Sequence, residues 1–299
     1  MLRTRVLTAA ILAPIILAIV VFGEPWLSIL LAVLGFLALV ELIALLDAGG
    51  FEPPQVLALV AGLGVLASGL VMANRSGVGG PLAALLDASD PPGLVAAALV
   101  AAILVVGIAA FTRAEPRAGF LTWAITSFGV AYVGLLLPAI ALVARLAPSG
   151  GSSGTAVGAI DLPSGVAWTL TLVLVVWGYD TGAYFTGRWL GRRRLVDHIS
   201  PSKTVEGLAG GLVAATFAAG LGALLIGLEP WHPLVIGPLV GIAAQAGDLA
   251  ESMVKRAAGR KESGVIIPGH GGVLDRIDSF LFAAPVLAGY ALFVAGRFV

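Results

Sequence analysis

The sequence contains no cysteine and few charged residues. Without cysteine, the chain has no disulfide bonds, thiolate nucleophiles, cysteine-ligated zinc or iron–sulfur clusters. Only 11% of the 299 residues are charged, whereas a soluble domain typically has about a quarter. The 17 basic and 17 acidic side chains cancel, which argues against nucleic acid as a main partner. A chain with so few charges cannot cover a water-facing surface of this size.

Hydrophobic residues make up 59% of the sequence, and the mean hydropathy is +1.03. An apolar run of about 20 residues is long enough for a helix to cross a hydrocarbon core of about 30 Å. Nine such runs predict an all-α polytopic membrane protein. The fifth run is long enough for its helix to be tilted or broken. The runs cover approximately 6–23, 26–46, 55–73, 93–112, 119–144, 166–187, 207–228, 233–254 and 279–298.

The distribution of basic residues predicts the orientation in the cell membrane. With the amino terminus in the cytoplasm, fourteen of the 17 Lys and Arg residues lie inside, and Arg75, Arg145 and Arg297 lie outside. This asymmetry follows the positive-inside rule, and nine spans then place the carboxyl terminus outside. Arg3 and Arg5 before the first run would also suit a secretory signal peptide. Because the run is long and no small-residue cleavage site follows, we expect a retained span.

Polar residues are concentrated in the later part of the chain. We therefore predict an N-terminal group of transmembrane helices in residues 1–112 and a C-terminal catalytic transmembrane domain in residues 113–299. The connections 74–92 and 145–165 are rich in Gly, Ser, Pro and Ala, and we expect flexible loops without chemistry there. No repeat or inverted pair of halves is evident, which weakens a transporter interpretation.

Acidic residues inside predicted spans are the first candidates for function, because an ionised carboxylate there is costly to insert. Asp180 and Asp248 both lie roughly 21–23 Å from the outer ends of their runs, at the same depth below the cytoplasmic surface. Glu41 reaches a similar level but stands alone at the end of its run. We interpret Glu41 as structural.

The segment around Asp180 places three polar groups on one helical face. Asp180, Tyr184 and Arg188 follow the i, i+4, i+8 spacing. Aromatic and basic residues are also usual at the end of a span. That alternative accounts for Tyr184 and Arg188 but not for Asp180, so we favour a functional face.

The segment from Ser200 to Glu206 has the composition of a phosphate site. Ser200 is expected to cap a helix with Pro201 at its first position, which would direct free N–H groups and a positive dipole end toward a phosphate. Lys203 and Thr204 would add donors, and Glu206 a counter-charge. Such caps also occur in every helical protein.

The region 247–279 combines acids, cations and glycines. Asp248, Glu251, Ser252 and Lys255 share one helical face, and Asp275, Asp278 and Ser279 repeat the i, i+3, i+4 spacing at the start of the last span. Oxygen ligands of this kind suit Mg²⁺. Glycines beside His270 allow close approach of the backbone to a ligand. The cations of this region are Lys255, Arg256, Arg260, Lys261 and Arg276.

These parts are the ones that phosphoryl or nucleotidyl transfer requires, because such chemistry depends on positioning and charge stabilisation. The alternative is a salt-bridged loop at the membrane surface, which would need neither intramembrane acids nor a Gly-rich segment. His270 is ambiguous by itself, since it could cap, bind a metal or only form a hydrogen bond. The signature motifs of P-loop ATPases, gluzincins and α/β-hydrolases are missing.

Together these motifs resemble the phosphatidate cytidylyltransferase family, also called CDP-diacylglycerol synthases. Glu262 replaces an Asp of the family pattern, and Ser202 stands where many members have a second lysine. Asp180-Thr181, Ala183-Tyr184, Gly187-Arg188, Ser200-Pro201, Lys203-Thr204 and Glu206-Gly207 also match, so the resemblance covers about residues 170–280. The C-terminal signature is matched by Ser252, Lys255, Arg256, Lys261, Pro268, His270, Gly271, Gly272, Asp275, Arg276 and Asp278.

The resemblance implies a dimeric, Mg²⁺-dependent enzyme that converts CTP and phosphatidic acid into CDP-diacylglycerol and pyrophosphate. It implies metal binding by Asp248, Asp275 and Asp278, with Asp180 in support. It implies charge neutralisation and substrate binding by Lys203, Lys255, Arg256, Arg276, Tyr184, Ser200, Thr204, Glu206, Ser252, His270, Gly271 and Gly272.

Two other classes of function remain open from the sequence. A CTP-dependent polyprenol or dolichol kinase would share a nucleotide site in the membrane but transfer the γ-phosphate. A transporter or channel would use Asp180, Asp248 and Glu41 along a translocation path.

Overall fold

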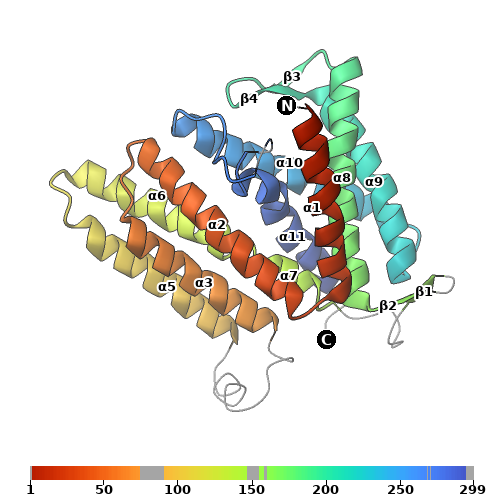
Figure 1. Cartoon of the computed structure of the whole chain (residues 1–299), viewed down its shortest axis with the longest axis horizontal. Coiled ribbons are helices and arrows are strands. Elements are labelled where there is room, and N and C mark those ends of the chain that lie inside the picture. The colour runs from red at the N-terminus through yellow and green to blue at the C-terminus, as the bar shows by residue number, and fades with distance from the viewer. Residues whose placement is uncertain are drawn as a thin grey trace. The chain divides into compact units, whose positions relative to one another are not determined.

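The structure is a computed structural model that describes residues 2–74, 91–146, 155–157, 160–267, 269 and 271–293. It is 77% helical, which confirms the predicted helical class (Figure 1). The helices are α1 (Leu2–Phe22), α2 (Trp26–Ala48), α3 (Gln55–Ala73), α5 (Pro91–Ala110), α6 (Pro116–Gly134), α7 (Ala139–Val143), α8 (Ser164–Leu190), α9 (Val205–Ile226), α10 (Pro233–Ala257) and α11 (Leu274–Phe293). The strands are β1 (Thr155–Val157), β2 (Ile160–Leu162), β3 (Arg194–Val196) and β4 (Ser200–Thr204).

Eight helical segments within the described residues are long and apolar enough to cross a membrane. They correspond to the second to ninth predicted runs, so the chain is a multi-pass membrane protein. The first run is also helical, but the apolar part of α1, Ala10–Phe22, is shorter than a full span. The ninth span and the side of the membrane on which each terminus lies therefore stay predictions.

The fifth span is broken. The segment Pro116–Val143 contains α6 and the short α7, with a turn from Leu135 to Pro138 between them. Pro138 has no backbone N–H and cannot continue the helical hydrogen-bond ladder. This break is one of the two outcomes expected from the length of the run.

The chain divides into two compact units. The first comprises Met1–Leu12, Glu24–Ala141 and Val254–Arg276, and the second comprises Ala13–Gly23, Leu142–Met253 and Ile277–Val299. The last turn of α10 and the first turn of α11 therefore belong to the first unit, and the rest of both helices belongs to the second. The predicted boundary at residue 112 stays a prediction.

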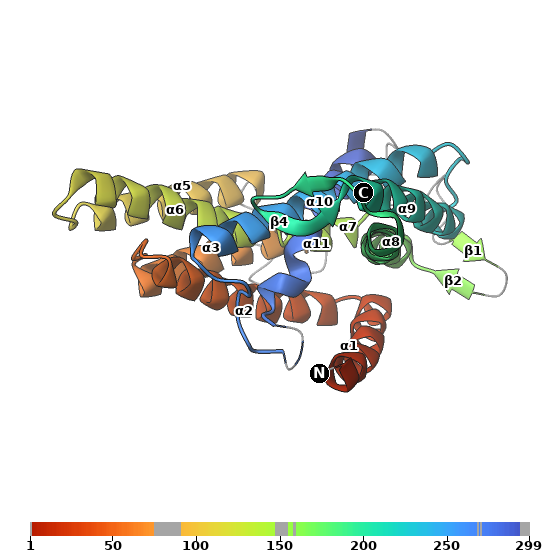
Figure 2. The same cartoon turned by 90° about the horizontal axis from the view of Figure 1, so that it is seen from above.

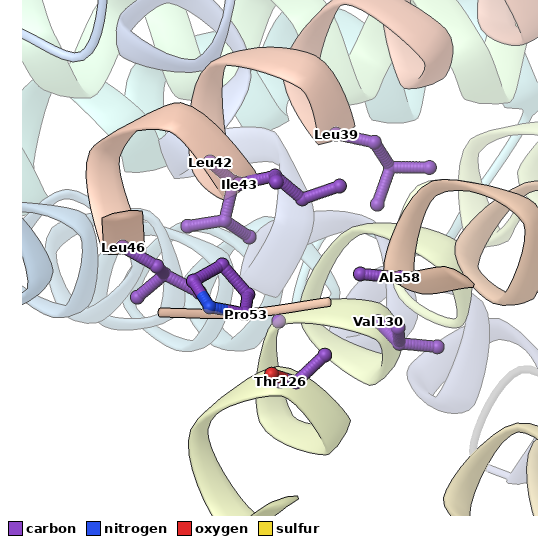
Figure 3. Close-up of a pocket in the computed structure, with 9 residues that line it drawn as sticks. Leu39, Leu42, Ile43, Leu46, Pro53, Ala58, Thr126 and Val130 are labelled. Atoms are coloured by element: carbon purple, nitrogen blue, oxygen red, sulfur yellow. The ribbon is translucent and has the colours of Figure 1, made fainter. Parts of the chain in front are cut away.

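In the first unit, α2, α3, α5 and α6 lie side by side (Figure 1). Val65, Ala102 and Val130 form a buried cluster that joins α3, α5 and α6. An apolar recess with an empty volume of about 220 Å³ lies among α2, α3 and α6 (Figure 3). Its lining has no charged side chain, so the recess lacks the cations that would bind the phosphates of a nucleoside triphosphate. The lining residues are Leu39, Leu42, Ile43, Leu46, Pro53, Ala58, Thr126, Gly129 and Val130.

In the second unit, α9 packs along α8 (Figure 2). Small residues allow this close approach, as is common between helices in membranes. A Cβ atom added to Gly182 of α8 would lie 2.5 Å from the Cβ of Ala214 and 2.8 Å from the carbonyl oxygen of Gly210. The packing therefore depends on the absence of a side chain at residue 182, which lies in the same helix turn as Asp180.

The second unit also contains two short antiparallel hairpins, which were not predicted. Strand β1 pairs with β2, and β3 pairs with β4 through Arg194 opposite Thr204 and Val196 opposite Ser200. Of the two connections that we expected to be flexible, 74–92 lies almost wholly outside the described residues, whereas the described part of 145–165 contains β1 and β2.

The prediction that Ser200 caps a helix is wrong. Ser200 and Pro201 lie in strand β4, and α9 begins only at Val205. The cap is Thr204, whose Oγ1 accepts a hydrogen bond of 3.0 Å from the N–H of Gly207. Pairing with β3 keeps residues 200–204 extended, and this long-range pairing outweighs the local helix-start signal of the Ser-Pro pair.

Candidate active site

Lys203 is the centre of a charged cluster in the second unit. It forms an ion pair with Asp248 of α10, and the two side chains are 29% and 20% exposed. Burial lowers the pKa of Lys203, but the carboxylates of Asp248, Asp180 and Asp278 outweigh burial and raise the pKa above its ordinary 10.5. Lys203 therefore carries a positive charge among three carboxylates at neutral pH. We call these four residues the Lys203 cluster.

Local structure explains how Lys203 reaches this place. Strand β4 is extended, and its last residue, Thr204, ends the strand and caps α9. The hairpin is further held by Glu206, whose Oε2 accepts hydrogen bonds from the N–H groups of Arg192 (3.0 Å) and Arg193 (3.2 Å). Lys203 is therefore attached to a backbone that is fixed from both sides.

Tyr179 holds α8, α9 and α10 together beside the Lys203 cluster. Its ring fills the space left by two glycines, because an added Cβ would lie 2.7 Å from the ring at Gly211 and 3.1 Å from it at Gly241. Its hydroxyl donates a hydrogen bond of 2.9 Å to Oε1 of Gln245. This buried contact fixes the helix turns that carry Asp180 and Asp248.

The approach of α10 to α11 brings Asp248 and Asp278 near each other. Gly247 lies against the backbone carbonyl of Asp278 and has no room for a Cβ, which would also lie 3.1 Å from the ring of Phe282. Asp278 is buried, and its Oδ1 accepts a hydrogen bond of 2.6 Å from the N–H of Ser279. The predicted acid Asp248 thus pairs with Lys203, and Asp180 and Asp278 also raise the pKa of this lysine.

Mg²⁺ fits the chemistry of the Lys203 cluster. Carboxylate oxygens are hard ligands of the kind that Mg²⁺ takes in proteins. Among the described residues, no three Asp, Glu or His side chains are placed to hold a metal by themselves. Mg²⁺ commonly takes one or two protein carboxylates and completes its coordination with water and substrate phosphates. The donor set therefore suits an ion that arrives with a phosphate ligand.

Asp275 belongs to a second charged group, in the first unit. Its Oδ1 accepts a 2.5 Å hydrogen bond from Nζ of Lys255. Its Oδ2 accepts from the N–H of Gly272 (2.9 Å) and from the N–H (3.0 Å) and hydroxyl (2.8 Å) of Ser263. Among the described residues, Oδ2 thus accepts from three donors and Oδ1 from one.

Glu41 also lies in the first unit, and its contacts are those of a structural residue, as expected. It is buried, and its carboxylate accepts hydrogen bonds from the N–H groups of Val273 (3.0 Å) and Leu274 (2.8 Å). These groups lie at the start of α11.

The remaining predicted residues have varied positions. Arg188 donates a 2.9 Å hydrogen bond to the hydroxyl of Tyr184, as the shared helical face predicts. Ser200 is half-buried in β4, Ser252 is buried in α10, and Gly271 has a φ of +81°, which favours glycine. Arg256 and Arg276 are exposed, and His270 lies outside the described residues.

Sequence reasoning missed Ser263 and Gln245. Ser263 joins Glu41 to Asp275, but it lies in a loop where no periodic pattern marks it. Gln245 is a lone amide in an apolar run and forms the hydrogen bond to Tyr179. A polar residue in a span is a usable signal, so Gln245 could have been identified from the sequence.

The fold and these two charged groups define a multi-pass helical membrane protein with paired acids and cations. Comparison with known proteins gives the family: the profile of the Cytidylyltransferase family matches residues 3–294. The chain belongs to this family.

Curated relatives named phosphatidate cytidylyltransferase are similar to part of the chain. The protein of Synechocystis sp. is 46% identical over 129 residues, which cover 42% of this chain and 44% of that protein. The protein of Bacillus subtilis is 47% identical over 125 residues, or 41% and 46% of the two lengths. The protein of Brucella suis biovar 1 is 46% identical over 128 residues, or 42% and 47%. The chain thus spans less than half the length of the curated relatives it matches.

Proposed function

We propose that the protein transfers CMP from CTP to phosphatidic acid, giving CDP-diacylglycerol and pyrophosphate for phospholipid synthesis. The observation that carries this proposal is the Lys203 cluster, in which one charged lysine lies among Asp180, Asp248 and Asp278. Membership of the Cytidylyltransferase family and similarity to proteins named phosphatidate cytidylyltransferase support it.

The proposed chemical step is a direct displacement at phosphorus. An oxygen of the lipid phosphate attacks the α-phosphorus of CTP, and a new P–O bond forms. The bond from the α-phosphorus to the oxygen that bridges to the β-phosphate breaks. Pyrophosphate leaves with that electron pair. No covalent enzyme intermediate is required, so the residues of the chain act by binding, orientation and charge stabilisation.

The cations of the two groups have distinct proposed tasks. Lys203 binds a phosphate of CTP, because its ammonium is a cation placed beside the carboxylate of Asp248. Lys255 is held by Asp275 and offsets triphosphate charge, and the exposed Arg256 and Arg276 bind the outer phosphates or the lipid headgroup. Thr204 accepts from Gly207 and keeps its hydroxyl proton for donation to a phosphate.

Mg²⁺ is the proposed cofactor. The resemblance to the phosphatidate cytidylyltransferases implies Asp248, Asp275 and Asp278 as its ligands and Asp180 as a supporting carboxylate. When bound, the ion would neutralise charge on the phosphates. The carboxylates that act on Lys203 support this assignment, because Mg²⁺ prefers oxygen ligands.

We also propose a cytoplasmic orientation of the reaction site and a homodimeric state. The concentration of Lys and Arg in the loops expected inside supports the orientation. A site on that side would meet a soluble nucleotide and a lipid headgroup together. The resemblance to the phosphatidate cytidylyltransferases supports the dimer.

Product labelling tests the proposed function. Detergent-purified protein is incubated with CTP, Mg²⁺ and phosphatidic acid, and each component is omitted in turn. Pyrophosphate release that needs all three, with label from α-labelled CTP entering the lipid, is the expected result. Label from γ-labelled CTP in the lipid would instead indicate a lipid kinase. A folded, monodisperse sample that releases no pyrophosphate would overturn the proposal.

A matched pair of variants links the activity to the Lys203 cluster. Asp248→Asn removes the carboxylate that pairs with Lys203, and pyrophosphate release is expected to fall at least about 100-fold. Asp197→Asn removes an exposed carboxylate in the β3–β4 turn and should leave the rate unchanged. Equal rates for the two variants would contradict a role of the cluster.

A further inference from the structure

We infer that Glu41 is a positioning residue that fixes Asp275 and the connection between α10 and α11 for cytidylyl transfer. This inference rests on the proposed function, and it gives the N-terminal helices a part in catalysis. Glu41 touches no reacting atom in this scheme and acts through Ser263 and Asp275.

The first step is the position of Glu41 at the start of α11. Its side chain is 4% exposed, and its two carboxylate oxygens accept separately from the N–H groups of Val273 and Leu274. The first N–H groups of a helix have no partner within that helix, and the helix dipole favours a negative charge there. Glu41 therefore holds the turn of α11 that carries Asp275.

The second step is a hydroxyl that faces both carboxylates. Oγ of Ser263 lies 3.3 Å from Oε2 of Glu41 and 2.8 Å from Oδ2 of Asp275. A serine hydroxyl has one proton and donates to one acceptor at a time. The N–H of Ser263 donates to Asp275 as well, at 3.0 Å. Displacement of Glu41 would therefore alter the hydrogen bond that the Ser263 hydroxyl donates to Asp275.

The third step is the space around the Glu41 carboxylate. A Cβ atom added to Gly264 would lie 2.5 Å from Oε1 of Glu41, and one added to Gly272 would lie 2.5 Å from Oε2. Each distance is too short for a methyl group. The absence of side chains at these two residues is therefore what lets Glu41 reach the backbone of the connection.

A plain cap of α11 would require only the contacts to Val273 and Leu274. The shared Ser263 hydroxyl and the two close glycines extend the contacts of Glu41 to the residues that hold Asp275. Because Asp275 also pairs with Lys255, a small shift of this group would misplace a proposed metal ligand and a phosphate-binding cation together. Misplacement by about 1 Å can lower a rate about 100-fold.

Glu41→Gln is the principal test, with Asp47→Asn as its matched control. The glutamine keeps the size of the side chain, but its amide NH₂ faces a donor and its charge is lost. We expect kcat to fall about 10- to 100-fold, with KM for CTP changed less than about threefold. Asp47 is an exposed acid on the same helix, and its variant should keep both constants. A wild-type kcat for Glu41→Gln would overturn the inference, as would a loss explained only by a smaller folded fraction.

A double-mutant cycle tests the path through Ser263. Ser263→Ala alone should lower kcat, and the double variant Glu41→Gln/Ser263→Ala should be little worse than the poorer single variant. Losses that multiply independently would contradict coupling. If Glu41→Gln does not fold, Gly264→Ala replaces it, because its methyl group displaces the Glu41 carboxylate while both acids remain. The same fall in kcat is expected, and an unchanged kcat would overturn the inference.

Trypsin cleavage at Arg260 and Lys261 separates this inference from the proposed function. Both residues are exposed in the connection between α10 and α11. Release of the connection in Glu41→Gln should raise the cleavage rate there at least severalfold over the rate in Asp47→Asn. If the wild-type protein makes no CDP-diacylglycerol but Glu41→Gln is still cleaved faster than Asp47→Asn, the proposed function is wrong. The conclusion that Glu41 holds the connection would then stand. Equal cleavage rates in the two variants would show that Glu41 does not hold the connection, whatever the activity of the protein.

Discussion

Lys203 of strand β4 forms an ion pair with Asp248 of α10, and this contact joins a surface hairpin to a membrane-spanning helix within one unit. Asp180 and Asp278 also stabilise the positive charge of Lys203, and together with Asp248 they outweigh the cost of burying that charge. A cation held in this way is available to a phosphate without a change of protonation.

A pH dependence of stability follows from the raised pKa of Lys203. A lysine whose pKa is higher in the folded than in the unfolded state stabilises the fold fully below its unfolded pKa. The contribution is lost as the pH rises from 10.5 through the folded value. Thermal unfolding of the wild type and Lys203→Met should therefore differ by a constant amount between neutral pH and pH 10.5, and the gap should narrow above pH 10.5. A gap that widens above pH 10.5 would contradict this sign.

Asp275→Asn is expected to abolish turnover while the protein remains folded. The amide keeps one acceptor oxygen but removes the charge that pairs with Lys255. The amide NH₂ would face the N–H groups of Gly272 and Ser263 or the ammonium of Lys255, and none of these can accept a hydrogen bond. Pyrophosphate release should fall more than about 100-fold. Near-normal release from a monodisperse sample would remove Asp275 from the proposed site.

The helices were predictable because each apolar run is long enough to cross the bilayer, and an isolated chain in lipid must satisfy its backbone groups internally. The role of Glu41 was not predictable in detail, because its partners lie 222 to 233 residues further along the chain. Asp180 and Asp248 were identified by the cost of an acid inside an apolar run, and Asp278 by its spacing at the start of the last run. In the structure all three acids raise the pKa of Lys203.

The hairpins show where local signals fail. Ser200 and Pro201 have the pattern of a helix start, yet residues 200–204 pair with β3. Strand pairing depends on residues 194 and 196, which no helix-start rule considers. The actual cap, Thr204, lies four residues later and was noted only as a phosphate donor.

The cap at Thr204 gives a stability prediction. Thr204→Val keeps the shape of the side chain but removes the oxygen that accepts from Gly207. The free energy of unfolding should fall by about 1 kcal/mol. Thr204→Ser retains the acceptor and should stay within a few tenths of a kcal/mol of the wild type. Denaturation in mixed detergent micelles measures both differences, and equal stability of the two variants would count against the cap.

Packing of α8 on α9 gives the last prediction, through two glycines that differ in their surroundings. A methyl group at Gly182 would lie 2.5 Å from the Cβ of Ala214, whereas one at Gly220 would meet no atom within 4 Å. Gly182→Ala should lower stability by about 1–3 kcal/mol, as overpacking does.

Gly220→Ala should be neutral or slightly stabilising, because alanine favours the helix more than glycine does. Gly182 lies in the same helix turn as Asp180, so separation of α8 from α9 would also move an acid away from Lys203. We therefore expect Gly182→Ala to reduce pyrophosphate release and Gly220→Ala to preserve it. Parallel thermal and activity measurements check both, and equal effects of the two variants would show that close packing at Gly182 does not position the Lys203 cluster.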